Sequence, residues 1–200
     1  MPSERDHTFL FADLVGFTAV TELEGDDRAL EVVLALQRRV RELLDEHGAE
    51  QVKTIGDGLM LHCREPEAAI QLGLKLVEGL EREPDFPPVR VGVHTGPALA
   101  NDGDWYGRTV NVAARLCAVA PGGEVMVSEQ TRHAAGDVPK VKWSERELHW
   151  LRNVTEPVAT YLALADGQLL PQTPEASKRR SLLQSRWGCR RGTASAEAFA

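Results

Sequence analysis

The sequence has few of the features that mark secreted, disulfide-bonded or nucleic-acid-binding proteins. Only three cysteines occur in 200 residues, and Cys63, Cys117 and Cys189 lie far apart. This spacing argues against a zinc site and against a disulfide framework, and it is typical of a reducing cytosol. The formal net charge is −7. We therefore expect no nucleic-acid polymer as a partner, because such binding requires neutralisation of many phosphates.

Long hydrophobic runs are also missing. Since no stretch reaches about 18 apolar residues, we expect no transmembrane segment. The charged start, Met1–Thr8, does not have the pattern of a signal peptide, so a cytoplasmic location is expected. What the sequence does have is 42% hydrophobic and 26% charged residues, an ordinary composition for a soluble globular protein. Its length suits one domain large enough to fold without disulfides.

Hydrophobic patterning predicts an α+β domain. Apolar runs bounded by turn residues predict strands, and apolar residues at helical spacing predict helices. The expected strands cover residues 8–12, 51–55, 59–63, 89–93, 124–127 and 158–164, and the expected helices cover 26–47, 66–80 and 107–119. The strands at 51–55 and 59–63 flank Gly56-Asp57-Gly58 and read as a hairpin. This order of elements suggests an antiparallel sheet with helices on one face.

The pattern stops after residue 165. Residues 166–200 contain six Lys or Arg and three Asp or Glu, whereas the preceding part is acidic. Such a segment has little material for a core, so we expect a domain over 1–165 followed by a disordered basic tail over 166–200.

Two acidic residues follow predicted strands. Asp13 ends an apolar run within FADLVGFT (Phe11–Thr18), and Asp57 lies within VKTIGDGL (Val52–Leu59). Alone, each is typical of a turn or cap residue. Together, two such carboxylates can chelate two divalent ions, and a glycine turn at Gly16 can bind a phosphate. A two-metal site serves phosphoryl displacement, and Mg²⁺ suits carboxylate and phosphate ligands.

Four motifs make a more specific case. They are FADLVGFT, VKTIGDGL, VRVGVHTGPALA (Val89–Ala100) and DWYGRTVNVAARL (Asp104–Leu116). In this order and spacing they resemble the catalytic domain of class III adenylyl and guanylyl cyclases, over about residues 8–165. The resemblance implies an α+β fold with a ferredoxin-like βαββαβ core extended by further strands and helices. A diguanylate cyclase has a similar fold, but its Gly-Gly-Asp/Glu-Glu-Phe signature is absent from this sequence.

The resemblance also implies a role for each matching residue. It assigns metal binding to Asp13, Leu14 and Asp57, triphosphate binding to Val15, Gly16, Phe17 and Thr18, base recognition to Lys53 and Asp104, ribose orientation to Asn111, and transition-state stabilisation to Arg115. It implies two Mg²⁺ or Mn²⁺ ions per active site and ATP as the substrate. It further implies a homodimer in which Asp13 and Asp57 of one protomer meet the remaining side chains of the other. The segment from Gly96 to Asp104 is shorter than in many family members.

The base-recognising pair can be checked by chemistry. Lysine only donates and an ionised aspartate only accepts, so Lys53 and Asp104 complement the N1 acceptor and N6 donor of adenine. Guanine presents the reverse order, which such a site rejects. An adenylate cyclase is therefore predicted. Two alternatives stay open: a guanylate or relaxed purine cyclase, and a catalytically silent domain that binds a nucleotide or a partner. Lys53 can also be a solvated strand residue, and Asn111 with Arg115 an ordinary surface pair.

Overall fold

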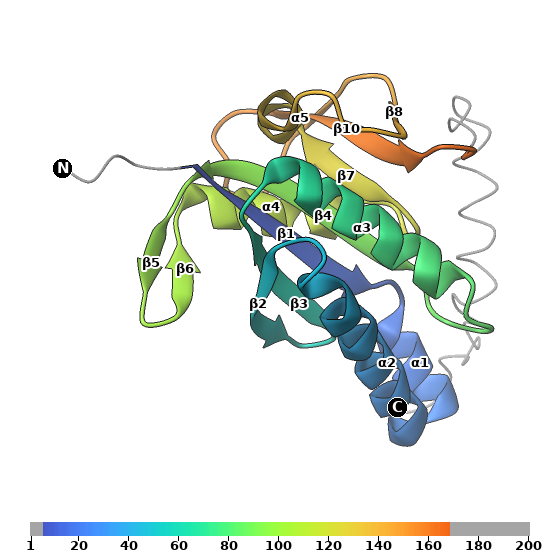
Figure 1. The fold of residues 1–200 in the computed structure, drawn as a ribbon. Coiled ribbons are helices and arrows are strands. Elements are labelled where there is room, and N and C mark those ends of the chain that lie inside the picture. Colours follow the sequence, from blue (N-terminus) through green and yellow to red (C-terminus); the bar gives the residue numbers. More distant parts are fainter. Residues whose placement is uncertain (1–5, 169–200) are drawn as a thin grey trace, which may run out of the picture. The chain divides into compact units, whose positions relative to one another are not determined.

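A computed structural model of the protein describes residues 6–168. Its first elements follow the predicted βαββαβ order (Figure 1). They are β1 (Asp6–Leu14), α1 (Phe17–Glu24), α2 (Asp26–Leu44), β2 (Ala49–Ile55), β3 (Gly58–Cys63), α3 (Pro66–Glu81) and β4 (Val89–Pro97). They are followed by β5 (Leu99–Asn101), β6 (Asp104–Tyr106), α4 (Arg108–Val119), β7 (Val125–Ser128), α5 (Glu129–Ala135), β8 (Val141–Trp143), β9 (Glu147–His149) and β10 (Val158–Ala165). Most of the tail expected at 166–200 lies outside the described residues.

The main sheet is mixed. Its strand order is β2-β3-β1-β4-β7-β10-β8, with β9 paired to β10. The first four strands are antiparallel and in the ferredoxin-like order, which confirms that part of the prediction. The prediction of a wholly antiparallel sheet is wrong, because β4 and β7 are parallel. Helix α4 lies between these two strands in the chain and provides the crossover that parallel neighbours require.

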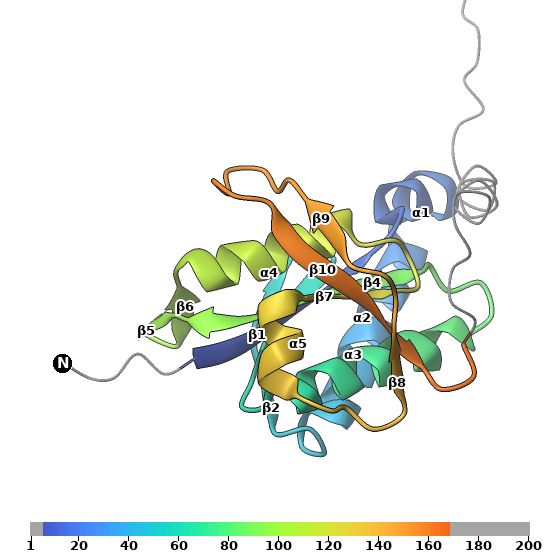
Figure 2. The ribbon, with the colours of Figure 1, turned by 90° about the horizontal axis from the view of Figure 1, so that it is seen from above.

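Helices cover both faces of this sheet, not one as the order of elements suggested (Figure 2). The central strand β1 is buried on both sides. Leu10 and Ala12 pack with α2 and α3, whereas Phe9 and Phe11 pack with α4 on the other face. Close approach of α4 depends on Gly92, where an added Cβ would lie 2.1 Å from the backbone nitrogen of Cys117. None of the helices described here is long and apolar enough to cross a membrane.

Candidate functional site

Strand pairing brings Asp13 and Asp57 together. Asp13 lies near the end of β1, and Asp57 lies in the two-residue turn between β2 and β3. The pairing of β1 with β3 reaches this turn, because Ala12 opposes Leu59. At Gly58 an added Cβ would lie 2.8 Å from the Ala12 carbonyl oxygen and 3.1 Å from Asp13 Oδ1. A glycine at this position therefore lets the turn lie against the Asp13 carboxylate.

The two carboxylates repel each other. Burial raises the pKa of Asp57, and the negative charge of Asp13 adds to this effect, while backbone hydrogen bonds and Arg90 oppose it. Half-buried carboxylates with like charges are a donor set that suits a divalent cation. No group of three or more His, Cys, Asp or Glu able to hold a metal occurs in residues 6–168. A cation here would thus need backbone, water or substrate oxygens to complete its coordination, as Mg²⁺ commonly does.

Arg90 is a member of this cluster that the sequence did not reveal. It lies on β4 directly opposite Asp13. Its Nη2 and Nε donate to Asp13 Oδ2 over 2.5 and 2.9 Å, and its Nη1 donates to the Ala118 carbonyl oxygen over 2.8 Å. The available signal was an arginine inside the otherwise apolar strand sequence VRVGV. Such a residue needs a partner, because an isolated charge is costly to bury.

The segment predicted to bind the triphosphate, Val15–Thr18, comes directly after Asp13 and Leu14 in the chain. Gly16 has a φ of 79° and precedes α1. Its carbonyl oxygen accepts from the backbone N–H groups of Ala19 and Val20. No side chain caps the start of α1. Leu14 is buried, Val15 and Phe17 are partly buried, and Thr18 is exposed. The segment thus runs from the carboxylate pair to a helix N-terminus that attracts negative charge.

Lys53 and Asp104 are brought together from β2 and β6. The Lys53 Nζ lies 2.5 Å from Asp104 Oδ2, and the backbone N–H of Trp105 donates to Asp104 Oδ1 over 2.8 Å. The hydrogen bond from Lys53 is the main cause that lowers the pKa of Asp104. Lys53 is thus paired with an acidic side chain, although its own side chain remains 40% exposed. The two residues predicted to recognise the base therefore lie together within one chain; base recognition itself stays a prediction.

Asn111 and Arg115 lie four residues apart on the exposed face of α4, whose other face buries Val112 and Leu116. Within residues 6–168, neither side chain has a hydrogen bond or an ion pair, and none joins them to Asp13 or Asp57. The chain thus holds two separate groups, the carboxylate pair with Arg90 and the pair of Lys53 with Asp104. The side chains of Asn111 and Arg115 are available for contacts outside their own chain.

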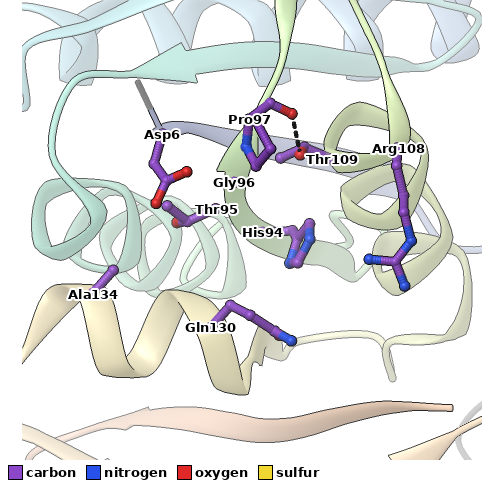
Figure 3. A pocket seen from close by; sticks show the side chains of 9 residues that line it. All are labelled: Asp6, His94, Thr95, Gly96, Pro97, Arg108, Thr109, Gln130 and Ala134. Carbon is purple, nitrogen blue, oxygen red and sulfur yellow. Dashed lines mark hydrogen bonds between the residues drawn. The ribbon is translucent and has the colours of Figure 1, made fainter. Parts of the chain in front are cut away.

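A pocket of about 270 Å³ lies at the other end of β4 from Arg90 (Figure 3). Its walls are formed by Asp6, His94, Thr95, Gly96, Pro97, Arg108, Thr109, Gln130 and Ala134. None of these residues belongs to the predicted site. Two buried polar side chains in its wall already have partners. His94 Nδ1 lies 2.7 Å from Ser128 Oγ, and Thr109 donates to the Pro97 carbonyl oxygen.

Several known proteins with similar sequences are adenylate cyclases. A family model described as the adenylate and guanylate cyclase catalytic domain matches residues 1–163. A pH-sensitive adenylate cyclase of Mycobacterium tuberculosis is 37% identical over 164 residues, which cover 80% of this chain and 41% of that protein. An adenylate cyclase of Streptomyces griseus is 33% identical over 135 residues, covering 65% of this chain and 33% of that protein. The chain therefore spans less than half the length of these relatives.

Solved structures show the same fold. An adenylate/guanylate cyclase/hydrolase from Silicibacter pomeroyi superimposes with a TM-score of 0.69 at 26% identity, covering 82% of this chain and 98% of that chain. An adenylate cyclase from Trypanosoma brucei, solved in its monomeric state, gives a TM-score of 0.76 at 24% identity, covering 84% of this chain and 91% of that chain. With the family model matched over residues 1–163, these similarities confirm the resemblance carried by the four motifs, and the chain belongs to the adenylate and guanylate cyclase catalytic domain family.

Proposed function

We propose that this protein is an adenylate cyclase that converts ATP to 3′,5′-cyclic AMP and pyrophosphate. The observation that carries the proposal is the pairing of Lys53 with Asp104, which sets a hydrogen-bond donor beside an acceptor. That arrangement complements adenine and opposes guanine. The two sequence relatives described above support the choice of substrate, since both are adenylate cyclases.

The carboxylate pair is proposed to hold the metal ions. Asp13 and Asp57, with the backbone at Leu14, would hold two Mg²⁺ or Mn²⁺ ions per active site. Bound there, such ions activate the ribose 3′-hydroxyl and neutralise charge on the phosphates. The repulsion between the carboxylates and the partial burial of Asp57 support this assignment.

The remaining residues are proposed to bind and orient ATP. The backbone from Val15 to Thr18 binds the triphosphate at the start of α1, and Arg90 supplies positive charge beside Asp13. Asn111 orients the ribose, and Arg115 stabilises the charge that develops on the phosphate. The 3′-oxygen forms a bond to the α-phosphorus, the bond from that phosphorus to pyrophosphate breaks, and the hydroxyl proton passes to solvent.

A homodimer is proposed as the working enzyme. In it, Asp13 and Asp57 of one protomer face Lys53, Asp104, Asn111 and Arg115 of the other. Three observations support this arrangement. Asn111 and Arg115 are exposed, no side-chain hydrogen bond or ion pair involves them within residues 6–168, and the nearby apolar side chains of Leu99 and Tyr106 are 69% and 52% exposed. A two-fold dimer would contain two equivalent sites.

A mixing assay tests the proposal. Asp13→Ala and Arg115→Ala chains are each expected to be inactive with ATP and Mg²⁺ or Mn²⁺, and their mixture to regain activity, because one site of the heterodimer keeps every residue. Wild-type chain assayed with ATP and GTP in parallel measures base preference. Heterodimers that form but remain inactive would contradict the shared site. Equal turnover of both nucleotides would indicate a relaxed purine cyclase, and nucleotide binding without turnover would indicate a silent domain.

A further inference from the structure

The β5–β6 hairpin carries Asp104 away from the main sheet. Figure 1 shows it projecting beyond the end of β4. Its two strands form a sheet of their own, and neither pairs with the main sheet. An isolated two-stranded hairpin is marginally stable in water. The location of Asp104 must therefore be fixed by side chains that attach the hairpin to the rest of the domain.

Trp105 provides such an attachment. Its ring stacks on His62 with 4.5 Å between centroids and 26° between planes. It also contacts His7 at 4.2 Å and meets Phe9 edge-on at 5.5 Å. Phe9 is fully buried, and these three rings come from β1 and β3. The indole thus joins the hairpin to two central strands, and aromatic contacts of this kind add to the stability gained by burial.

The rings beneath Trp105 are themselves held in place. His62 Nδ1 lies 2.9 Å from Glu50 Oε1, and His62 Nε2 lies 3.1 Å from His7 Nδ1. Both ring nitrogens of His62 are therefore engaged, which fixes the plane on which the indole stacks. The hairpin is attached to a surface of defined orientation.

Trp105 also contacts Asp104 through its backbone. Its N–H donates to Asp104 Oδ1, while Lys53 binds Oδ2. Two donors on different oxygens define the orientation of the carboxylate. Because the first of these donors is the backbone N–H of Trp105, the residue that attaches the hairpin also holds the carboxylate.

We propose that Trp105 is a positioning residue for base recognition, whose ring, stacked on His62, holds Asp104 where it meets Lys53. The inference rests on the proposed function, since it concerns how the same site distinguishes ATP from GTP. Trp105 acts through Asp104 and needs no contact with the reacting atoms. Selectivity and ATP affinity are therefore the quantities that it controls.

Substitution of Trp105 tests the proposal. Trp105→Ala is expected to lower the ratio of kcat/KM for ATP to that for GTP at least about tenfold, because a displaced acceptor no longer favours adenine. KM for ATP is expected to rise by a larger factor than kcat falls. Trp105→Phe keeps an aromatic ring and is expected to retain most of the selectivity. In an Asp104→Asn background, Trp105→Ala is expected to leave the ratio unchanged.

Trp143→Ala is the matched control. Trp143 lies on β8, at the opposite end of the strand order from β2, and its ring meets Tyr161 with 6.2 Å between centroids and the Arg132 guanidinium at 5.1 Å. Its loss is expected to lower thermal stability and to leave the ATP/GTP ratio unchanged. If Trp105→Ala does not fold, Trp105→Leu replaces it. A folded Trp105 variant with lower kcat for both nucleotides and an unchanged ratio would overturn the proposal.

Hydrogen exchange separates this inference from the proposed function. Amides of residues 99–106 are expected to exchange at least about tenfold faster in the Trp105→Ala chain and at the wild-type rate in the Trp143→Ala chain. If wild-type protein makes no cyclic AMP, the proposed function fails, and hydrogen exchange still tests whether Trp105 holds the hairpin. Unchanged exchange in the Trp105→Ala chain would overturn the positioning role independently of activity.

Discussion

Arg90 and Asp13 face each other across the β1–β4 ladder, with both Arg90 Nη2 and Nε bonded to the same carboxylate oxygen, Asp13 Oδ2. The other oxygen, Oδ1, lies next to Gly58 and the turn that carries Asp57. Positive charge on Arg90 therefore offsets the repulsion between the two carboxylates. A divalent cation bound to the same pair would serve the same electrostatic purpose.

Replacement of Arg90 is expected to make the fold more dependent on metal. Without divalent ions, Arg90→Ala leaves Asp13 beside Asp57 without its charged donor, and the free energy of unfolding is expected to fall by about 2 kcal/mol. Added Mn²⁺ is expected to raise the melting temperature of this variant more than that of wild type. Thermal denaturation with and without Mn²⁺ measures both effects. Arg28→Ala, which removes an exposed pairing with Glu31, is the control and should respond to Mn²⁺ as wild type does.

Gly58→Ala is expected to disturb Asp13 directly. The new methyl group would meet the Ala12 carbonyl oxygen at 2.8 Å, which the backbone can relieve only by moving the turn away from β1. We expect a loss of the proposed cyclase activity of more than about tenfold, because Asp13 is proposed to hold the metal ions and small displacements of such groups are costly. Gly56→Ala has open space around it but a φ of 59°, so it should cost about 1 kcal/mol of stability and keep most activity. Equal activity in the two variants would contradict this account.

Local sequence patterns predicted the turn and most helices well. The Gly56-Asp57-Gly58 hairpin is confirmed, because two flanking strands and the favoured turn residues lie within one short segment. The helix opening at Pro66 is confirmed for the same reason, since its start signal and its apolar spacing are both local. The β5–β6 hairpin was missed, although Asp102-Gly103 at its turn was an available signal.

Features that depend on distant strands were predicted less well. Pairing of Arg90 with Asp13 joins residues 77 positions apart, and no local pattern states which strands are neighbours. Helices on both faces were missed for a related reason. The unbroken apolar run Phe9–Ala12 is typical of a strand buried on both sides, but a short run of this kind does not identify its covering helices. The short helix α1 was missed because it begins at Phe17, within the FADLVGFT motif. The residues of that motif were interpreted as metal-binding and phosphate-binding residues.

Exchange of Lys53 and Asp104, the residues proposed to recognise the base, is expected to change nucleotide preference. Guanylyl cyclases typically have glutamate and cysteine in place of Lys53 and Asp104. Lys53→Glu with Asp104→Cys supplies an acceptor for guanine N1–H and removes the acceptor that adenine N6 needs. The double variant is expected to lose at least about 100-fold in kcat/KM for ATP relative to GTP. Lys53→Glu alone should be less stable than the double variant, because it places a glutamate beside Asp104. A double variant that retains the wild-type ATP preference would contradict the assignment.

The buried His94 should make the fold sensitive to mild acid. Burial, with a smaller contribution from the positive charge of Arg108, lowers the pKa of His94 from 6.5 to about 4. Protonation is therefore disfavoured in the folded state, so the stabilising effect of neutral His94 is complete above pH 6.5 and is lost as the pH falls from 6.5 towards 4. The full loss of stability is on the order of 3 kcal/mol.

Urea unfolding between pH 7 and 5 should show a steeper loss of stability for wild type than for His94→Gln, which keeps a polar group near Ser128 and cannot titrate. His133→Gln, at an exposed histidine, should follow wild type. Parallel pH profiles for wild type and His94→Gln would show that another group governs the acid response.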